Sequence, residues 1–263
     1  MIRNLLAEKN IEVLREFASS DLLLAFDFDG TLAPIVPDPA AAKMRARTRE
    51  LMVRVCRHYP AIIVSGRAAS DVRDRVRGVG LLEVIGNHGL EPWRRSEDFA
   101  KQVKRWIPTL KQRLAPYKGV VIEDKTFSVA VHYRKSREKR LAREAIAAAA
   151  RELEPLRVVG GHQVVNLLPE GAPHKGIALS AARDRLGCDT ALYVGDDETD
   201  EDVFARDEPG RLLTIRIGQK MSSRAAYFLE DQSHIDELLW QLLLLRSKPF
   251  TAKARQKAAG VAS

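Results

Sequence analysis

The sequence contains little cysteine: among 263 residues only Cys56 and Cys188 are present. They lie far apart, and neither has a cysteine or histidine neighbour at the spacing of metal ligands, which excludes a zinc site and a disulfide framework. Because unpaired thiols are usual in the reducing cytosol, we expect a cytoplasmic protein.

Long apolar segments are also missing. No stretch approaches the ~18 consecutive apolar residues that span a bilayer, so we expect no membrane partner. Glu8, Lys9 and Glu12 interrupt the region where a secretory signal needs an apolar segment. No nucleic-acid-binding motif is recognisable, and we expect no such partner. The formal net charge of +8 favours anions in general and does not by itself choose between a macromolecule and a small phosphorylated substrate.

What the chain does have is the composition of a globular protein, 45% hydrophobic and 30% charged. Short β-rich segments alternate with helical patterns in two parts of the chain, which predicts an α/β fold with a Rossmann-like parallel sheet. The strands are expected at 22–26, 61–64, 82–85, 191–194, 212–217 and 226–229, and the helices at 48–58, 70–76, 177–186 and 201–205.

Between these parts the pattern changes to αββαββ, which predicts an inserted α+β cap. We therefore predict a catalytic core made of residues 1–91 and 170–263 and a cap made of residues 92–169. Within the cap, helices are expected at 99–114 and 136–153, and strands at 120–123, 127–133, 157–159 and 163–168, with the last two joined by a turn at Gly160-Gly161.

The most informative segment is 22–32, where an apolar run typical of a buried strand ends in Asp27 and Asp29. Open α/β sheets bind their ligands at this end of the strands. Two carboxylates so close need a cation, and a divalent metal would leave one of them free to attack a phosphate. The alternative is an ordinary Asp-Gly turn in which Thr31 starts a helix.

Two later segments offer groups that hold phosphate. Ser65-Gly66-Arg67 follows a predicted strand and presents a hydroxyl and amides at a helix start, although an ordinary helix cap has the same residues. Lys175 also precedes a helix, where the helix dipole disfavours a cation unless an anion lies nearby. A surface lysine without a role is the alternative.

An acidic loop at 195–202 follows the strand expected at 191–194. Oxygen-rich loops of this kind suit Mg²⁺. A structural role at a helix N-terminus explains some of the carboxylates, Glu201 and Asp202 in particular.

The chain resembles the haloacid-dehalogenase superfamily in four motifs and in their order. These motifs are Asp-Phe-Asp-Gly-Thr-Leu, Val-Ser-Gly-Arg, Lys-Gly and Gly-Asp-Asp-Glu-Thr-Asp-Glu-Asp. Within it, the segments at 86–91 and 123–134 are similar to the trehalose-6-phosphate phosphatases, and the likeness covers about residues 20 to 245. The resemblance implies a Mg²⁺-dependent phosphomonoester hydrolase that releases phosphate from trehalose 6-phosphate, the last step of trehalose biosynthesis.

The resemblance also implies roles for single residues. Asp27 attacks phosphorus, while Asp29 protonates the leaving hydroxyl and then activates water. The metal is held by Asp27, the Asp29 carbonyl and Asp196, with Asp197 or Asp200 acting directly or through water. The phosphoryl oxygens are held by Thr31, Ser65, Arg67 and Lys175.

The cap of such enzymes closes over the sugar and selects it. The sugar contacts implied by the resemblance are Asn87, His88, Glu91, Glu123, Lys125, His132, Arg134 and Asn166. Asn166 departs from the family pattern, which usually has Glu there, and Leu168 replaces a common basic residue. An amide keeps an acceptor but loses the charge that strengthens hydrogen bonds to hydroxyls.

This departure leaves other substrates open: sucrose phosphate, mannosyl- or glucosyl-phosphoglycerate, or another sugar phosphate. Phosphoryl transfer to a sugar, as in a mutase, is a further alternative. An alternative from another functional class is a non-catalytic anion-binding protein that uses the basic tail at 248–257 and the apolar helix expected at 238–245. We expect that helix to pack on the core of a monomer.

Overall fold

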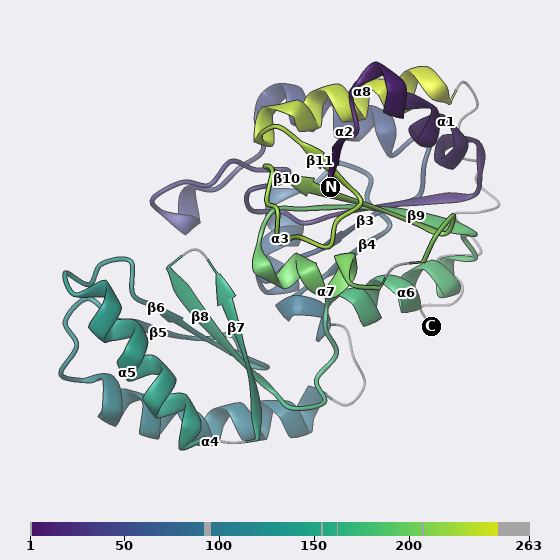
Figure 1. Ribbon diagram of the computed structural model, residues 1–263. Coiled ribbons are helices and arrows are strands. Elements are labelled where there is room, and N and C mark those ends of the chain that lie inside the picture. The colour runs from purple at the N-terminus through teal and green to yellow at the C-terminus, as the bar shows by residue number, and fades with distance from the viewer. Residues whose placement is uncertain (1, 92–95, 154, 162, 207, 247–263) are drawn as a thin grey trace.

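The computed structural model describes residues 2–91, 96–153, 155–161, 163–206 and 208–246. The basic tail at 248–257 therefore lies outside the described residues. Figure 1 shows two layered units, one built on a seven-stranded parallel sheet and the other on a four-stranded antiparallel sheet. The predicted α/β fold with a separate cap sheet is confirmed.

The core sheet has the strand order β1-β11-β10-β9-β2-β3-β4. All six strands predicted for it are present, with bounds that differ by at most a residue. Its strands are β1 (Arg3–Asn4), β2 (Leu22–Phe26), β3 (Ala61–Val64), β4 (Glu83–Ile85), β9 (Thr190–Gly195), β10 (Leu212–Ile217) and β11 (Tyr227–Leu229).

Strand β2 lies at the centre of this sheet, between β9 and β3, and every one of its residues is buried. Burial of each leucine side chain in this strand contributes about 1.5–3 kcal/mol to stability. Helices cover both faces: α1, α2 and α8 lie on one side and α6 and α7 on the other (Figure 1). The core helices are α1 (Ile11–Ser19), α2 (Ala46–Val55), α3 (Ala69–Arg75), α6 (Lys175–Leu186), α7 (Glu201–Phe204) and α8 (Ile235–Leu245).

The sequence patterns did not predict the N-terminal elements. The two-residue strand β1 pairs with β11, and Leu5 behind it is fully buried. A strand of this length has too few residues for a detectable alternation of apolar and polar side chains. Helix α8 packs on α1 and α2, as expected for the apolar segment at 238–245.

The cap sheet has the order β5-β6-β8-β7, and α4 and α5 cover one of its faces (Figure 1). Its own apolar core includes Trp106, Val131, Ile146 and Leu167. The elements are α4 (Ser96–Leu114), β5 (Val121–Asp124), β6 (Val129–His132), α5 (Lys139–Arg151), β7 (Leu156–Gly161) and β8 (Val164–Pro169). The exact domain bounds stay a prediction, and the proposed first junction, at 91–92, borders residues 92–95, which are outside the described residues.

The prediction of a turn at Gly160-Gly161 is wrong, because both glycines belong to β7. They lie against the acidic loop of the core: a Cβ on Gly160 would sit 2.4 Å from Glu198 Oε2, and one on Gly161 3.0 Å from Asp197 Oδ2. The glycines thus leave room for the carboxylate side chains of Glu198 and Asp197 instead of making a turn.

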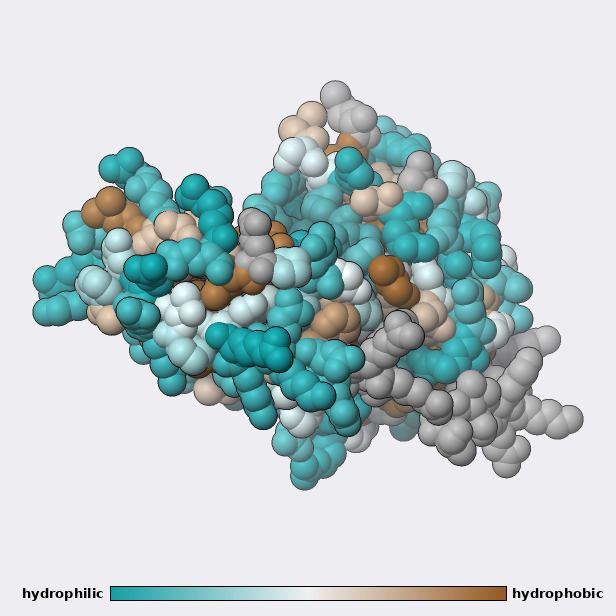
Figure 2. Space-filling view, turned by 90° about the horizontal axis from the view of Figure 1, so that it is seen from below, coloured by the Kyte–Doolittle hydropathy of each residue, from teal (hydrophilic) through white to brown (hydrophobic). Residues whose placement is uncertain are grey.

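The face in Figure 2 is mostly hydrophilic, with apolar residues scattered among polar ones. The large apolar side chains that are exposed belong to separate segments of the chain, for example Ile35, Leu141 and Met221. None of the described helices is both long and apolar enough to cross a membrane.

Candidate active site

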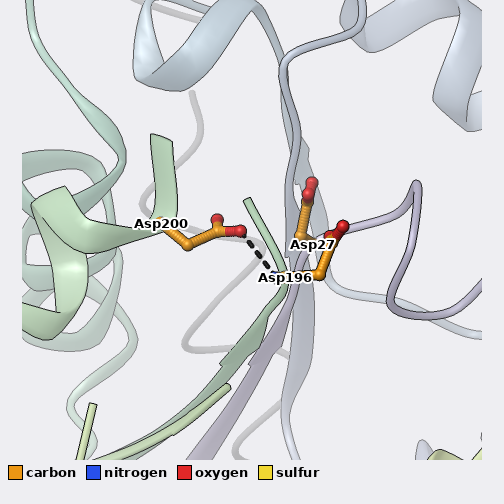
Figure 3. Close-up of side chains that lie close together, drawn as sticks. All are labelled: Asp27, Asp196 and Asp200. Atoms are coloured by element: carbon orange, nitrogen blue, oxygen red, sulfur yellow. Dashed lines mark hydrogen bonds between the residues drawn. The ribbon is translucent and has the colours of Figure 1, made fainter. Parts of the chain in front are cut away.

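The carboxyl ends of two neighbouring strands bring the central carboxylates together. Asp27 follows β2 and Asp196 follows β9, and Figure 3 shows their side chains next to each other with Asp200 opposite. One oxygen from each of these three residues lies within 4.8 Å of the others. Gly30 makes room for this arrangement, because a Cβ there would lie 2.0 Å from Asp196 Oδ2.

Lys175, the first residue of α6, is the cation of this cluster. It is 1% exposed, and its Nζ lies 3.2 Å from Asp27 Oδ1 and 2.7 Å from Asp200 Oδ1. Burial alone would lower the pKa of Lys175, but the two carboxylates raise it well above its ordinary value. The surface-lysine alternative is therefore wrong, and the carboxylates are the anions that offset its position at a helix N-terminus.

Asp200 is fully buried and accepts hydrogen bonds on both oxygens. Oδ1 accepts from Lys175 Nζ at 2.7 Å and from the Tyr193 hydroxyl at 2.6 Å. Oδ2 accepts from the main-chain N–H groups of Asp196 and Asp197, both at 2.9 Å. With two bonds on each oxygen, Asp200 orients Lys175 and the acidic loop, whereas Asp27 and Asp196 keep acceptor sites open for a further partner.

These groups fit a divalent cation. No hydrogen-bond donor among the described residues is aligned with the buried Asp27 Oδ1. Burial and the nearby carboxylates raise the pKa of Asp27 to about 7, although Lys175 opposes the shift. Burial, Asp27 and Asp200 also raise the pKa of Asp196 well above its usual range. A bound cation would compensate this crowded negative charge and supply the missing partner.

The stability of the metal-free protein is expected to depend on pH through Asp27. A raised folded pKa stabilises the fold below the unfolded value of 3.8, and this contribution is lost as the pH rises towards about 7. In chelator, the free energy of unfolding by urea should therefore fall between pH 5 and 8 by a few kcal/mol more in the wild type than in Asp27→Asn. Added Mg²⁺ should remove this difference between the wild type and Asp27→Asn. If both proteins show the same pH dependence of stability in chelator, the raised pKa of Asp27 is contradicted.

Asp29 lies beside the cluster and is held by Arg67. The guanidinium makes two hydrogen bonds to the Asp29 carboxylate, Nε at 2.6 Å and Nη2 at 2.8 Å. Arg67 also donates to Asp71 at 2.8 Å and to the carbonyl of Pro39 at 2.8 Å. Arg67, predicted to bind phosphate, therefore binds the carboxylate of Asp29, the predicted acid/base. It restricts the orientation of the Asp29 side chain.

The two predicted hydroxyl ligands of phosphate are both buried at this edge. Thr31 Oγ1 lies 3.4 Å from Asp196 Oδ1, and the Gln232 amide donates to the Thr31 carbonyl at 2.8 Å. Ser65 Oγ accepts the N–H of Arg67 at 3.2 Å, but the helix that follows starts at Ala69 with Ala68 as its N-cap and no side-chain cap, so the helix-cap alternative is wrong.

Comparison with known proteins identifies the family. A family model described as trehalose-phosphatase matches residues 25–233. The chain belongs to the trehalose-phosphatase family. It is 37% identical over 194 residues to the trehalose-phosphate phosphatase of Mycobacterium tuberculosis, covering 68% of this chain and 49% of the relative. It is 28% identical over 270 residues to the probable trehalose-phosphate phosphatase D of Arabidopsis thaliana, covering 90% and 72%.

The chain thus spans about half the length of the mycobacterial relatives that it matches. Among solved structures, the C-terminal domain of a Candida albicans trehalose-6-phosphate phosphatase superposes with a TM-score of 0.77 at 20% identity, covering 94% of this chain and all of that one. A sucrose-phosphatase from Synechocystis superposes with a TM-score of 0.55 at 16% identity, covering 86% and 98%. These likenesses show the haloacid-dehalogenase-like fold.

Several family positions predicted to contact sugar meet where the cap touches the core. Asn87 Nδ2 donates to Glu91 Oε1 at 2.6 Å and to the main-chain carbonyl of Lys125 at 3.0 Å. Lys125 Nζ donates to the carbonyl of Gly66 at 3.0 Å. Asn87 and His88 both have left-handed backbone conformations, with φ of 47° and 59°. This strained turn is thus hydrogen-bonded to the cap segment that contains Lys125, and a substrate contact at Asn87 and His88 stays a prediction.

The remaining predicted sugar residues lie on or next to the cap sheet. His132 Nε2 and Glu123 Oε2, on paired strands, are 2.7 Å apart, and this hydrogen bond together with the charge of Lys125 lowers the pKa of Glu123. Asn166 lies on β8 and is 4% exposed. The cap sheet therefore presents both charged and amide groups for directed hydrogen bonds.

Arg134 is placed differently. Its Nη1 donates to the carbonyls of Val36 and Pro37, at 3.1 and 3.0 Å, in the loop that follows the Asp27 segment. A cap residue is thereby hydrogen-bonded to a loop of the core.

Asp197, predicted to act on the metal, accepts the N–H of Glu198 at 2.8 Å and caps the short 3-10 helix η4 (Glu198–Asp200). Sequence reasoning missed Tyr193, Arg216 and Gln232. For the first two a signal exists, since each puts a polar group between apolar neighbours in a buried strand.

Proposed function

We propose that this chain hydrolyses trehalose 6-phosphate to trehalose and phosphate through an aspartyl phosphate on Asp27. The observation that carries the proposal is the buried Asp27 carboxylate, whose Oδ1 lies 3.2 Å from Lys175 Nζ and which is grouped with the carboxylates of Asp196 and Asp200 at the carboxyl edge of the core sheet. A binding protein has no need for such a costly cluster of buried charges.

In the first step an Asp27 oxygen attacks phosphorus, and the bond from phosphorus to the sugar oxygen breaks as that oxygen takes a proton from Asp29. In the second step Asp29 takes a proton from water, whose oxygen attacks phosphorus and releases Asp27. Lys175, Thr31 and Ser65 hold the phosphoryl oxygens and offset their charge. Asp29 must break its two hydrogen bonds to Arg67 for part of this cycle. A phosphate dianion that binds Arg67 in its place would release it.

The proposed metal is Mg²⁺, held by the carboxylates of Asp27 and Asp196, by the Asp29 carbonyl and, through water, by Asp197. It would neutralise the attacking carboxylate and the phosphate dianion.

For the sugar, we infer that the cap supplies Glu123, Lys125, His132 and Asn166, and that the core turn supplies Asn87, His88 and Glu91. A neutral disaccharide offers only hydroxyl groups, so it is recognised by directed hydrogen bonds of this kind. We also propose the division into a core, residues 1–91 and 170–263, which carries out the chemistry, and a cap, residues 92–169, which recognises the sugar. We also infer a cytoplasmic setting, which the low cysteine content of the sequence favours.

The decisive experiment measures phosphate release from a panel of trehalose 6-phosphate, sucrose 6-phosphate, glucosyl-phosphoglycerate and glucose 6-phosphate, with Mg²⁺ and with chelator. We expect the highest kcat/KM with trehalose 6-phosphate and no turnover in chelator. A preference for another sugar phosphate would assign the chain to that substrate, in line with Asn166 in place of glutamate. Turnover that survives chelator would refute the metal assignment.

The grip of Arg134 predicts a separate effect. Arg134→Gln should raise the KM for trehalose 6-phosphate roughly tenfold, because two charge-assisted hydrogen bonds between cap and core are lost in a partly exposed position. The exposed Arg137 lies three residues further along, so Arg137→Gln is the matched control. If both variants keep the wild-type KM, the contact of Arg134 with the core does not contribute to substrate binding.

A further inference from the structure

Arg216 is a buried cation for which the proposed chemistry has no use. It lies near the end of β10, is 8% exposed, and is surrounded in its strand by apolar residues. A guanidinium is placed in such a position only when its donors are satisfied. Its partners therefore indicate its role.

Those partners are the carbonyl oxygens of the acidic loop. Nη2 donates to the carbonyl of Asp196, and Nη1 donates to the carbonyl of Asp197 at 3.2 Å. Nη1 also bonds Glu201 Oε1 at 3.1 Å, and the other oxygen of Glu201 accepts the Arg224 N–H at 2.9 Å. Arg216 thus grips two successive peptide groups and is itself anchored by a carboxylate.

The same two residues are held from their other side by Asp200. Its Oδ2 accepts both main-chain N–H groups, of Asp196 and Asp197, at 2.9 Å (Figure 3 shows the first). Gly195 permits this approach, because a Cβ there would lie 2.3 Å from the Asp200 Cγ. An anion holds the N–H groups and a cation holds the carbonyls of one dipeptide.

We propose that Arg216 and Asp200 form an ionic clamp on the main chain of Asp196 and Asp197, and that Arg216 is a positioning residue for metal binding by Asp196. The inference rests on the proposed metal site. The clamp fixes the peptide from which the Asp196 side chain extends towards Asp27, so the ligand geometry exists before the ion arrives. The guanidinium also places positive charge behind a loop crowded with carboxylates.

Residues that hold metal ligands in place typically change metal affinity by about 10–100-fold when they are replaced. An arginine that only fills space would affect stability and leave metal affinity unchanged. The two roles are therefore separated by measuring metal affinity and stability on the same variants.

The probe is Mn²⁺, whose free and bound forms are distinguished by electron paramagnetic resonance, titrated into the full chain without substrate. The variants are Arg216→Met, which removes donors and charge, Arg216→Lys, which keeps the charge but not the fork, and Glu201→Gln, which weakens the anchor. Arg211→Met is the matched control, because Arg211 is exposed just before β10 begins. Urea unfolding in chelator reports the stability of each.

We expect the Mn²⁺ dissociation constant to rise at least tenfold in Arg216→Met, less in Arg216→Lys and Glu201→Gln, and not in Arg211→Met. Folded Arg216→Lys and Glu201→Gln proteins with wild-type Mn²⁺ affinity would overturn the clamp, as would a wild type that binds no Mn²⁺. Binding is measured without turnover, so failure to hydrolyse trehalose 6-phosphate would refute the proposed function and leave this result standing.

Discussion

Asp27→Asn is expected to abolish phosphate release, with kcat lowered by roughly a million-fold, the scale seen when a covalent nucleophile is removed. The amide occupies the same space, but its oxygen is too weak a nucleophile to attack phosphorus. The measurement is phosphate release from trehalose 6-phosphate at saturating Mg²⁺. Folding should be preserved, because the change removes a charge from a site where Asp27 is 5% exposed and crowded by other carboxylates.

Asp74→Asn makes the same chemical change at a carboxylate whose side chain is 73% exposed, and it should keep full activity. Mass spectrometry of rapidly quenched wild-type protein should locate the transient phosphate on the peptide that contains Asp27. A phosphorylated peptide elsewhere, or an active Asp27→Asn protein, would disprove the assignment of the nucleophile.

Lys175→Met should have the second-largest effect, on stability as well as on activity. Lys175 Nζ bridges Asp27 and Asp200, which are 5% and 0% exposed, so its loss leaves two buried carboxylates without their cation. Removing one partner of a buried ion pair costs about 3–5 kcal/mol. Urea unfolding in chelator measures this loss, and kcat should also fall by about 10²–10³ through lost charge stabilisation.

A double variant tests the cause. Lys175→Met combined with Asp200→Asn removes both members of the shorter ion pair and should recover part of the lost stability, although not the activity. Lys220→Met is the control, since Lys220 is 39% exposed and 4.0 Å from its partner Glu198. A Lys175→Met protein as stable as this control would show that the buried ion pairs contribute little.

The sequence alone determined the fold class and the family. Alternating strands and helices predict the parallel sheet because crossover connections place consecutive strands side by side. Asp27 was recognised because it follows a buried strand of a parallel sheet, and Lys175 because a lysine at a helix N-terminus indicates an anion nearby. The structure brings these two within 3.2 Å, although they are far apart in the chain.

Only the tertiary structure decided how the charges pair. No pattern shows that Asp200 binds Lys175 and Tyr193, that Arg67 grips Asp29, or that Arg134 reaches the core loop. These partners depend on side-chain directions and on the distance between cap and core, which local sequence does not encode. Gly160 and Gly161 illustrate the limit, since a turn and the close approach of a side chain from another segment call for the same residue.

The sequence therefore determined which chemical groups this protein possesses and the sheet edge at which they meet, because periodicity and strand order are local and topological properties. The tertiary structure decided which carboxylate faces which cation, because hydrogen bonds and ion pairs are made over about 3 Å between segments far apart in the chain. The role inferred for Arg216 needs both sequence and structure. The sequence shows a charged residue in strand β10, and only the tertiary structure shows its hydrogen bonds to the acidic loop.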